Sequence, residues 1–381
     1  MPFSFSFESP TGIYFGAGES ERLADLPAPY GRRVLVLTGR SWLSSSGWQD
    51  RLKKILQKYT VRFFACASGE PSVESIEEAR EGVSDFDPEV LVAVGGGSVL
   101  DTAKALSALI SLKESPLEYL EGVGKGRRLE EPGIPWIAVP TTSGTGAEVT
   151  KNSVIRAKEK GAKKSLRSPY LIAAYAVVDP ELTLDLPLRI TGISGMDALT
   201  QLIESYVSRK AQPMVGALVR DALPGMLTAL KKLSEDLQDL DARTDAAYGS
   251  MISGIALANA GLGAAHGFAS GIGGLFDIPH GLICAVCLPY VVERNATEIE
   301  APIGRLLREA GLYTGGDPLG WLVAEIRALF EPYGLEKDLR SFGIGRDRIE
   351  EIAERSSGSS MSGNPVPLSL QDKVAILQSI L

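Results

Sequence analysis

The sequence predicts a chain of two parts, an N-terminal α/β domain built on a parallel sheet and an all-helical C-terminal domain. Over the first half, short apolar runs alternate with stretches of helical spacing, which is the pattern of consecutive βαβ units. After Pro187 the apolar residues recur at helical spacing, with no convincing strand between them. We therefore place the boundary within residues 180–188 and assign residues 1–182 to the α/β domain and residues 183–381 to the helical domain.

The predicted strands are short and apolar throughout, as expected for strands that are buried on both faces of a sheet. They are residues 32–39, 61–67, 90–97, 136–142 and 173–180. Three stretches between them have helical spacing, and these are residues 46–59, 73–83 and 98–109. Strands separated by helices indicate a parallel sheet that helices cover on both faces.

The second part contains three long stretches of amphipathic or apolar helical spacing, at residues 186–208, 215–237 and 318–334. The stretch from Met251 to Phe276 has no charged residue and is long enough to cross a bilayer. It is rich in Gly, Ala and Ser, however, and has few large aliphatic side chains. We interpret it as buried helix with loops, not as a membrane span. Residues 356–365 are expected to form a flexible loop.

Composition narrows the classes of function. The formal net charge is −8, from 39 basic and 47 acidic residues, so a nucleic-acid partner is not expected. Three cysteines are too few for a disulfide framework, which favours a reducing compartment. The first ten residues lack the basic and apolar regions of a signal peptide. We expect an acidic, soluble, cytoplasmic enzyme without a membrane partner.

Glycine-rich turns that follow predicted strands are the candidate phosphate sites. In residues 92–104 an apolar strand leads into Gly95, Gly96 and Gly97, and Ser98 then opens a helix. Backbone N–H groups can approach an anion closely there, and the helix N-terminus adds partial positive charge. A tight turn without a ligand is the alternative. The Gly-x-Gly of residues 16–23 is weaker, because no strand of a βαβ unit precedes it, and it is better read as a turn.

A second candidate loop follows the next predicted strand. Residues 139–150 place Thr141, Thr142, Ser143 and Thr145 around two glycines. Hydroxyl groups and glycines without charge suit a ligand held by many small donors, although a plain polar loop has the same composition. Because ligands gather at the carboxyl edge of a parallel sheet, two such loops at successive strand ends favour a shared site.

The only two histidines of the chain, His266 and His280, lie in one glycine-rich stretch, residues 263–281. Both can offer a neutral imidazole to a metal, although a buried histidine is often structural. Asp197 and Gln201, one helical turn apart, can complete an oxygen and nitrogen ligand set for Zn²⁺ or Fe²⁺. The alternative for Asp197 is a helix-start residue that the macrodipole favours. Cys284 and Cys287 follow His280 as Cys-x-x-Cys, and we interpret them as packed core thiols.

Taken together, these motifs resemble the iron-containing (group III) alcohol dehydrogenase family over nearly the whole chain. The stretches that carry the resemblance are GGGSVLDTAKAL, PTTSGTGAEVT, SPYLIAAYAVVDPELTLDLP, GMDALTQLIESYVS and AAHGFASGIGGLFDIPHGLICAVCLPYV, in the family's order. The resemblance implies a Rossmann-like N-terminal domain that binds NAD(P), a helical C-terminal domain that binds metal and substrate, and a metal in the cleft between them.

The resemblance also implies site residues. Those expected to contact the dinucleotide are Gly96, Gly97, Ser98, Asp101, Thr141, Thr142, Thr145, Asn152 and Lys163. After the strand that ends in Gly39, relatives that use NAD often carry an acidic residue, whereas this chain has Arg40 and Ser41. Since Arg40 can pair with a 2′-phosphate, we expect NADP to be preferred, with NAD possible.

The metal site departs from the family at two positions. The family uses an Asp, a His four residues later and two further histidines, which here correspond to Asp197, Gln201, His266 and His280. An amide oxygen is a weaker ligand than imidazole, so the alternatives for Fe²⁺ or Zn²⁺ are a site of three strong ligands plus water, a loosely held ion, or no ion. Ser270 stands where many members carry a histidine thought to relay protons.

The resemblance implies hydride transfer between a nicotinamide and a small alcohol or aldehyde, with Asp197, His266 and His280 as the catalytic metal-binding residues, in a homodimer. A metal-independent reductase of the maleylacetate reductase type is the first alternative, and Asp197 argues against it. A lyase like dehydroquinate synthase is the second alternative, and the motifs fit it less well. No feature of the helical domain selects one substrate.

Overall fold

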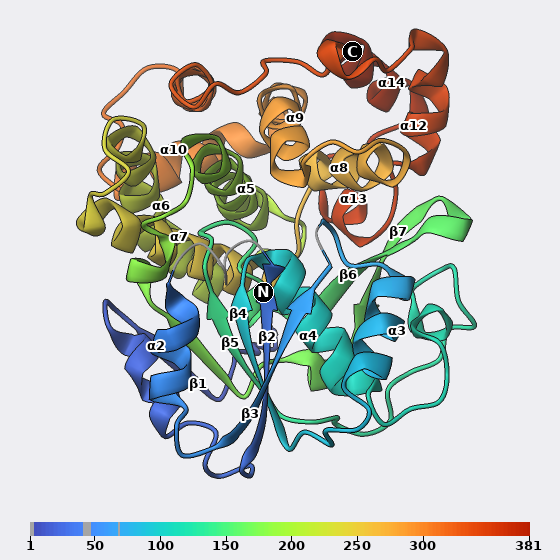
Figure 1. Cartoon of the computed structure of the whole chain (residues 1–381). Helices are drawn as coiled ribbons and strands as arrows, with labels where there is room; N and C mark the ends of the chain where they lie inside the picture. Colours follow the sequence, from blue (N-terminus) through green and yellow to red (C-terminus); the bar gives the residue numbers. More distant parts are fainter. Residues whose placement is uncertain (1–3, 41–46, 68) are drawn as a thin grey trace. The chain divides into compact units, whose positions relative to one another are not determined.

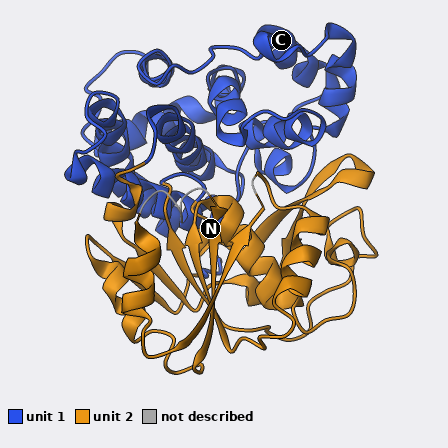
Figure 2. Cartoon of the chain, viewed as in Figure 1, with its two compact units in different colours: residues 1–8, 143–145, 186–381 blue, residues 9–142, 146–185 orange. Residues whose placement is uncertain are grey.

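A computed structural model describes residues 4–40, 47–67 and 69–381 of the chain (Figure 1). It divides into two compact units (Figure 2). The α/β unit comprises Ser9–Thr142 and Gly146–Asp185. The helical unit comprises the segment that ends at Glu8, the short segment Ser143–Thr145, and Leu186–Leu381.

The α/β unit is built on a six-stranded parallel sheet in the order β1-β8-β5-β4-β2-β3. The strands are β1 (Gly12–Phe15), β2 (Arg33–Gly39), β3 (Thr60–Cys66), β4 (Val90–Gly95), β5 (Trp136–Pro140) and β8 (Tyr175–Val178). The five predicted strands are all present, and the parallel sheet is confirmed. β1 was not predicted; it pairs with β8 at one edge of the sheet.

Both faces of this sheet are buried, as predicted for a doubly covered sheet. Alternate residues of β2 enter different apolar clusters, Leu35 and Leu37 on one face and Val34 and Val36 on the other. Helices α3 (Val73–Gly82) and α4 (Gly97–Leu109) contribute to the first cluster, and α2 (Trp48–Ile55) contributes to the second. All three correspond to predicted helices.

An antiparallel hairpin is the second unpredicted feature of the α/β unit. It consists of β6 (Asn152–Ala157) and β7 (Ala162–Arg167), which form a separate two-stranded sheet. Lys104 of α4 is fully buried and ties this hairpin to the helix, because its Nζ donates to the carbonyl oxygen of Asn152 at 2.9 Å. The hairpin is therefore held against the middle of α4.

The helical unit contains no strand among its described residues, as predicted. Its helices are α5 (Leu188–Val207), α6 (Pro213–Leu233), α7 (Leu240–Ala260), α8 (Ala264–Leu275), α9 (His280–Arg294), α10 (Ala296–Glu309), α11 (Pro318–Ala328), α12 (Ile349–Arg355), α13 (Ser359–Gly363) and α14 (Leu370–Ile380). α9 packs against both α5 and α8, and these three helices carry the candidate metal ligands (Figure 1).

Two interpretations of the helical part are settled by these bounds. The uncharged stretch Met251 to Phe276 consists of the end of α7, a short loop and α8, so the interpretation as buried helix with loops is confirmed. Among the described residues, no helix is both long and apolar enough to cross a membrane. The flexible loop expected over residues 356–365 is wrong in part, because α13 forms there.

Candidate metal centre and dinucleotide-binding loops

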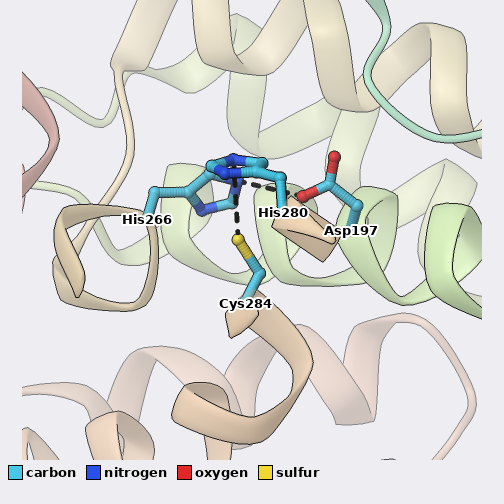
Figure 3. A group of neighbouring side chains, drawn as sticks. All are labelled: Asp197, His266, His280 and Cys284. Atoms are coloured by element: carbon cyan, nitrogen blue, oxygen red, sulfur yellow. Dashed lines mark hydrogen bonds and ion pairs between the residues drawn. The ribbon is translucent and has the colours of Figure 1, made fainter. Parts of the chain in front are cut away.

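Four side chains of the helical unit converge on one point (Figure 3). They are Asp197 from α5, His266 from α8, and His280 and Cys284 from α9. One ligand atom from each residue lies within 4.8 Å of the others. Asp197, His266 and Cys284 are buried, and His280 is partly exposed. The sequence predicted three of these four residues as metal ligands and interpreted the fourth, Cys284, as a core thiol.

Close packing of α9 on α5 brings His280 to Asp197. Gly281 lies at this contact, where an added Cβ would be 2.4 Å from the carbonyl oxygen of Ile193 and 3.0 Å from Cβ of Asp197. Only glycine leaves room for the two helices at this point. Asp197 lies well inside α5, which begins at Leu188, so the alternative of a helix-start residue is wrong.

Glu204 fixes the orientation of His266. The Glu204 carboxylate is buried, and one of its oxygens lies 2.7 Å from Nδ1 of His266. Its other oxygen accepts from the backbone N–H of Ala265 at 2.7 Å, within the first turn of α8. A carboxylate that holds the Nδ1 proton leaves the lone pair of Nε2 for a metal. The sequence contains a signal for this role, since Glu204 lies two helical turns after Asp197 inside an apolar stretch.

Gln201 lies beside Asp197 and makes two hydrogen bonds. Its Nε2 donates to Oδ2 of Asp197 at 3.2 Å, and its Oε1 accepts from Oγ of Ser253 at 2.9 Å. In this arrangement the amide holds one carboxylate oxygen of Asp197 and turns its own oxygen toward α7. The other carboxylate oxygen, Oδ1, lies 3.4 Å from Nε2 of His266.

The donor set fits a divalent cation. Oδ1 of Asp197 and Nε2 of His266 are buried, and neither has a hydrogen-bond partner of ordinary geometry among the described residues. Burial of polar atoms without partners is costly, and a bound cation removes that cost. Two imidazoles, a carboxylate and a thiol are also the ligand types that Zn²⁺ and Fe²⁺ accept.

The ionisable groups of the centre influence one another strongly. Burial alone would raise the pKa of Asp197, but the nearby His266 and His280 outweigh burial and lower it. Burial opposes a charged His266, yet Cys284, Asp197 and Glu204 together raise its pKa well above the ordinary value. Burial raises the pKa of the Cys284 thiol to about 12. The Asp197 carboxylate and the His266 imidazole therefore stabilise each other's charged forms, while burial keeps the Cys284 thiol protonated.

The candidate dinucleotide loops lie together in the α/β unit. β2, β4 and β5 are adjacent and parallel, so Gly39, the Gly95–Gly97 turn and Thr141 follow the carboxyl ends of three neighbouring strands. Strand order reverses between β2 and β4, the position where open α/β sheets bind ligands.

The turn between β4 and α4 has the features expected of an anion site. An added Cβ on Gly96 would lie 3.1 Å from Cγ2 of Thr142, so this turn and the next loop approach closely. Gly96 is the N-cap of α4, and no side chain of the described residues caps this helix. Its first N–H groups, including those of Gly97 and Ser98, suit a pyrophosphate.

The remaining predicted dinucleotide residues have mixed surroundings. Asp101 binds Nζ of Lys104 at 3.1 Å and accepts from the N–H of Val154 at 2.9 Å, so it joins α4 to the hairpin. Lys163 forms an ion pair with Glu70. Asn152 begins β6, and its buried Oδ1 lacks a hydrogen-bond partner among the described residues.

Arg40, Ser41 and Thr145 are the last three predicted dinucleotide residues. Arg40 is exposed directly after β2. Ser41 lies outside the described residues. Thr145 is exposed and belongs by its contacts to the helical unit.

The weaker Gly-x-Gly stretch, residues 16–23, forms a turn whose backbone N–H groups bind the side chain of Asp179. Its carboxylate accepts from the N–H groups of Gly18 and Ser20, both at 3.1 Å. The interpretation as a turn is therefore confirmed. A strand does precede this turn, because β1 ends at Phe15, but it pairs with β8 at the edge of the sheet and not with the next strand, β2. β1 is short and half-buried, which weakens its apolar signal.

Comparison with known proteins agrees with this architecture. Residues 10–180 match the profile of iron-containing alcohol dehydrogenases, and residues 191–381 match the C-terminal profile of the Fe-containing alcohol dehydrogenase family. Long-chain-alcohol dehydrogenase 1 of Geobacillus thermodenitrificans is 34% identical over 91% of this chain and 89% of its own length. NADPH-dependent butanol dehydrogenase of Clostridium saccharobutylicum is 30% identical over 98% of this chain and 97% of its own length.

Solved structures give the same result. The 1,3-propanediol oxidoreductase structure superposes with a TM-score of 0.93 at 26% identity, with 100% of both chains covered. The alcohol dehydrogenase from Oenococcus oeni gives 0.91 at 27% identity, covering 99% of this chain and 100% of its own. The chain belongs to the iron-containing alcohol dehydrogenase family. It is an NAD(P)-dependent oxidoreductase of the alcohol dehydrogenase class, and the reductase and lyase alternatives are not favoured.

Proposed function

We propose that this chain transfers a hydride reversibly between C4 of NADP(H) and a small alcohol or aldehyde, with Fe²⁺ or Zn²⁺ held by Asp197, His266 and His280. The observation that carries the metal proposal is the buried pair Oδ1 of Asp197 and Nε2 of His266, which lack hydrogen-bond partners among the described residues. A divalent cation there would supply Lewis-acid polarisation of a carbonyl or alcohol oxygen.

The protein's own residues prepare this site. Glu204 holds the Nδ1 proton of His266 and so fixes the imidazole tautomer in which Nε2 faces Asp197. Gln201 holds Oδ2 of Asp197 and thereby fixes the direction of Oδ1. Ser270 lies one turn after His266 on α8 and is partly buried, so its hydroxyl is our candidate for the proton path that a histidine provides in many relatives.

The preference for NADP(H) rests on the end of β2. The chain has no carboxylate at Gly39 and Arg40, so nothing at these two residues repels a 2′-phosphate, and the Arg40 guanidinium can bind it. The pyrophosphate would bind the N-terminus of α4 at Gly96, Gly97 and Ser98. The NADPH-dependent butanol dehydrogenase of Clostridium saccharobutylicum is similar over nearly the whole chain, which supports the same assignment.

We further propose a cytoplasmic homodimer. The three cysteines are buried and free, which suits a reducing compartment. Light scattering of the purified protein tests the oligomeric state, and a mass equal to one chain of 40.6 kDa would contradict the dimer.

The direct test of the function combines metal analysis with an assay. Protein purified without chelator is analysed for bound metals and then supplied with NADPH and a panel of short aldehydes. We expect about one Fe²⁺ or Zn²⁺ per chain and aldehyde-dependent oxidation of NADPH that stops after chelation and returns with metal. Activity that survives complete removal of metal would overturn the metal assignment and favour a metal-independent reductase.

A further inference from the structure

The metal centre contains a potential ligand, Cys284, that the sequence analysis did not predict. Cys284 follows His280 by one turn of α9, so both side chains lie on the same face of the helix. The sulfur lies 3.7 Å from Nε2 of His280. Figure 3 shows the Cys284 sulfur pointing away from α9 and toward the imidazole rings of His266 and His280.

Two of the distances between these ligand atoms are close to those around a tetrahedral ion. Zinc bonds of about 2.3 Å to sulfur and about 2.0–2.1 Å to nitrogen or oxygen imply ligand separations of roughly 3.4–3.6 Å. The separation of 3.7 Å between Cys284 and His280 and that of 3.4 Å between Asp197 and His266 are both close to this range. A small inward movement of side chains would place all four atoms around one ion.

Gln201 does not compete with Cys284 for the fourth ligand position of the ion. Its Oε1 accepts from Ser253 of α7 and its Nε2 donates to Asp197, so the atom that faces the carboxylate is the NH₂ donor and not the oxygen that could bind a metal. An inverted amide would set two oxygens against each other at the 3.2 Å contact with Asp197. Gln201 stands where the family has a histidine ligand and does not itself face the ion. Cys284 can therefore take the fourth ligand position.

We propose that Cys284 is the fourth protein ligand of the metal and that its sulfur makes the site prefer Zn²⁺ over Fe²⁺. This inference rests on the proposed function, which requires a metal at Asp197, His266 and His280. On binding, the thiol proton leaves to solvent and a sulfur lone pair forms the bond to the ion. Thiolate is a soft ligand that favours zinc, and a zinc ion with four protein ligands can accept a fifth, so substrate can still bind.

Cobalt substitution tests the sulfur ligand directly. Apoprotein is titrated with Co²⁺ for the natural chain, for Cys284→Ser and for Cys287→Ser, and the absorption spectra are recorded. Cys287 is the matched control, since it is fully buried on the same helix but outside the group of four. We expect a sulfur-to-cobalt charge-transfer band in the natural chain and in Cys287→Ser, and its loss in Cys284→Ser.

Metal affinity gives a second result from the same proteins. Loss of an outer partner of a ligand costs roughly 10–100-fold in metal affinity, so loss of a true ligand should cost at least as much. We expect Cys284→Ser to weaken Zn²⁺ binding by 100-fold or more and to reduce the preference for Zn²⁺ over Fe²⁺. Cys287→Ser should bind both ions as the natural chain does.

A spectroscopic measurement on the natural zinc protein needs no variant and remains decisive if Cys284→Ser does not fold. X-ray absorption should show one zinc–sulfur distance of about 2.3 Å among nitrogen and oxygen ligands. One bound ion with only nitrogen and oxygen ligands would overturn the role of Cys284 and leave the proposed function intact. No bound ion at all, in a protein that still oxidises NADPH, would overturn both metal assignments.

Discussion

Glu204 is the residue whose loss should most clearly separate positioning from ligation. It touches His266 at Nδ1 and caps the first turn of α8 through Ala265, but it is not among the four converging side chains. Glu204→Gln keeps the shape but sets an amide NH₂ against one of these donors, so we expect Zn²⁺ affinity to fall about 10–100-fold. Chelator competition measures the affinity.

The free energy of unfolding of the apoprotein is the companion measurement for Glu204→Gln. One unsatisfied buried donor should lower it by about 1–3 kcal/mol. Unchanged zinc affinity in the folded variant would contradict a role for Glu204 in holding His266. Loss of stability alone would indicate a helix cap and no more.

Arg40 is the residue on which the cofactor preference rests. Arg40→Asp places a carboxylate at the end of β2, where it can accept from a ribose 2′-hydroxyl and repel a 2′-phosphate. We expect the ratio of kcat/KM for NADPH to that for NADH to reverse. Arg32→Asp is the matched control, because Arg32 is also exposed but precedes the amino end of the same strand. An unchanged ratio in Arg40→Asp would contradict the proposal that Arg40 sets the preference for NADPH.

Site residues differed in how far the sequence predicted them. His266 and His280 stood out because the chain has no other histidine, and Asp197 stood out by its spacing to Gln201. Cys284 and Glu204 have equally regular spacing, but their roles depend on how closely α8 and α9 approach α5. A single helix pattern carries no information about that approach, so Cys284 was interpreted as a core thiol and Glu204 was not singled out.

At the scale of elements, the close contact between α9 and α5 should be disrupted when one methyl group is added at Gly281. In Gly281→Ala the added Cβ would lie 2.4 Å from a backbone oxygen, which cannot move without moving α5. We expect a loss of about 1–3 kcal/mol in the free energy of unfolding, together with weaker metal binding because His280 shifts. Urea denaturation and chelator competition measure the two effects.

Gly273→Ala is the control for this contact. Gly273 lies in α8, and the nearest atom to an added Cβ is 3.9 Å away. Alanine also favours a helix by up to about 1 kcal/mol over glycine. Gly273→Ala should therefore leave stability unchanged or raise it, and equal losses in both variants would refute a specific contact at Gly281.

The buried carboxyl of Glu148, just before β6, predicts a pH dependence of stability. Burial raises its pKa from 4.5 to about 7, against a smaller opposing effect of Lys104. Between these two pH values the folded protein holds a proton that the unfolded chain has released, so the free energy of unfolding falls as pH rises. We expect the natural chain to lose on the order of 1–3 kcal/mol from pH 5 to pH 8 relative to Glu148→Gln.

Unfolding by urea at several pH values tests this prediction, and the comparison with Glu148→Gln removes the contribution of all other groups. A difference between the two proteins that is constant with pH would show that Glu148 titrates normally. A difference that grows in the opposite direction would mean that Glu148 is charged in the folded state at pH 5.

Secondary structure was predictable where one physical signal dominated. The buried parallel strands are continuous apolar runs, and the long helices repeat their apolar residues at helical spacing. β1 has only four half-buried residues, and β7 is half-buried over most of its length and carries Lys163, Lys164 and Arg167, a composition that a surface loop also has. β1 forms by pairing with β8, and β6 and β7 form by pairing with each other. The sequences of these strands alone do not reveal that pairing.

At the scale of the whole molecule, the two units should respond to different ligands. All the candidate metal ligands belong to the helical unit, whereas the glycine turn at Gly96 and most of the predicted dinucleotide residues belong to the α/β unit. A ligand at 100 times its dissociation constant stabilises the native state by about 2.7 kcal/mol. Local opening free energies differ across a structure, so we expect this stabilisation to be largest in the elements that contact the ligand.

Hydrogen exchange measured with Zn²⁺ alone and with NADPH alone tests this division. We expect Zn²⁺ to slow exchange in α5, α8 and α9, and NADPH to slow it at the β4–α4 turn and after β5. The peptide that covers residues 141–150 should respond to both ligands, because Ser143–Thr145 belongs to the helical unit and Gly144 packs directly against Ser194 of α5. Equal protection of every helix and strand by either ligand would mean that the chain unfolds as one cooperative unit, contrary to this division.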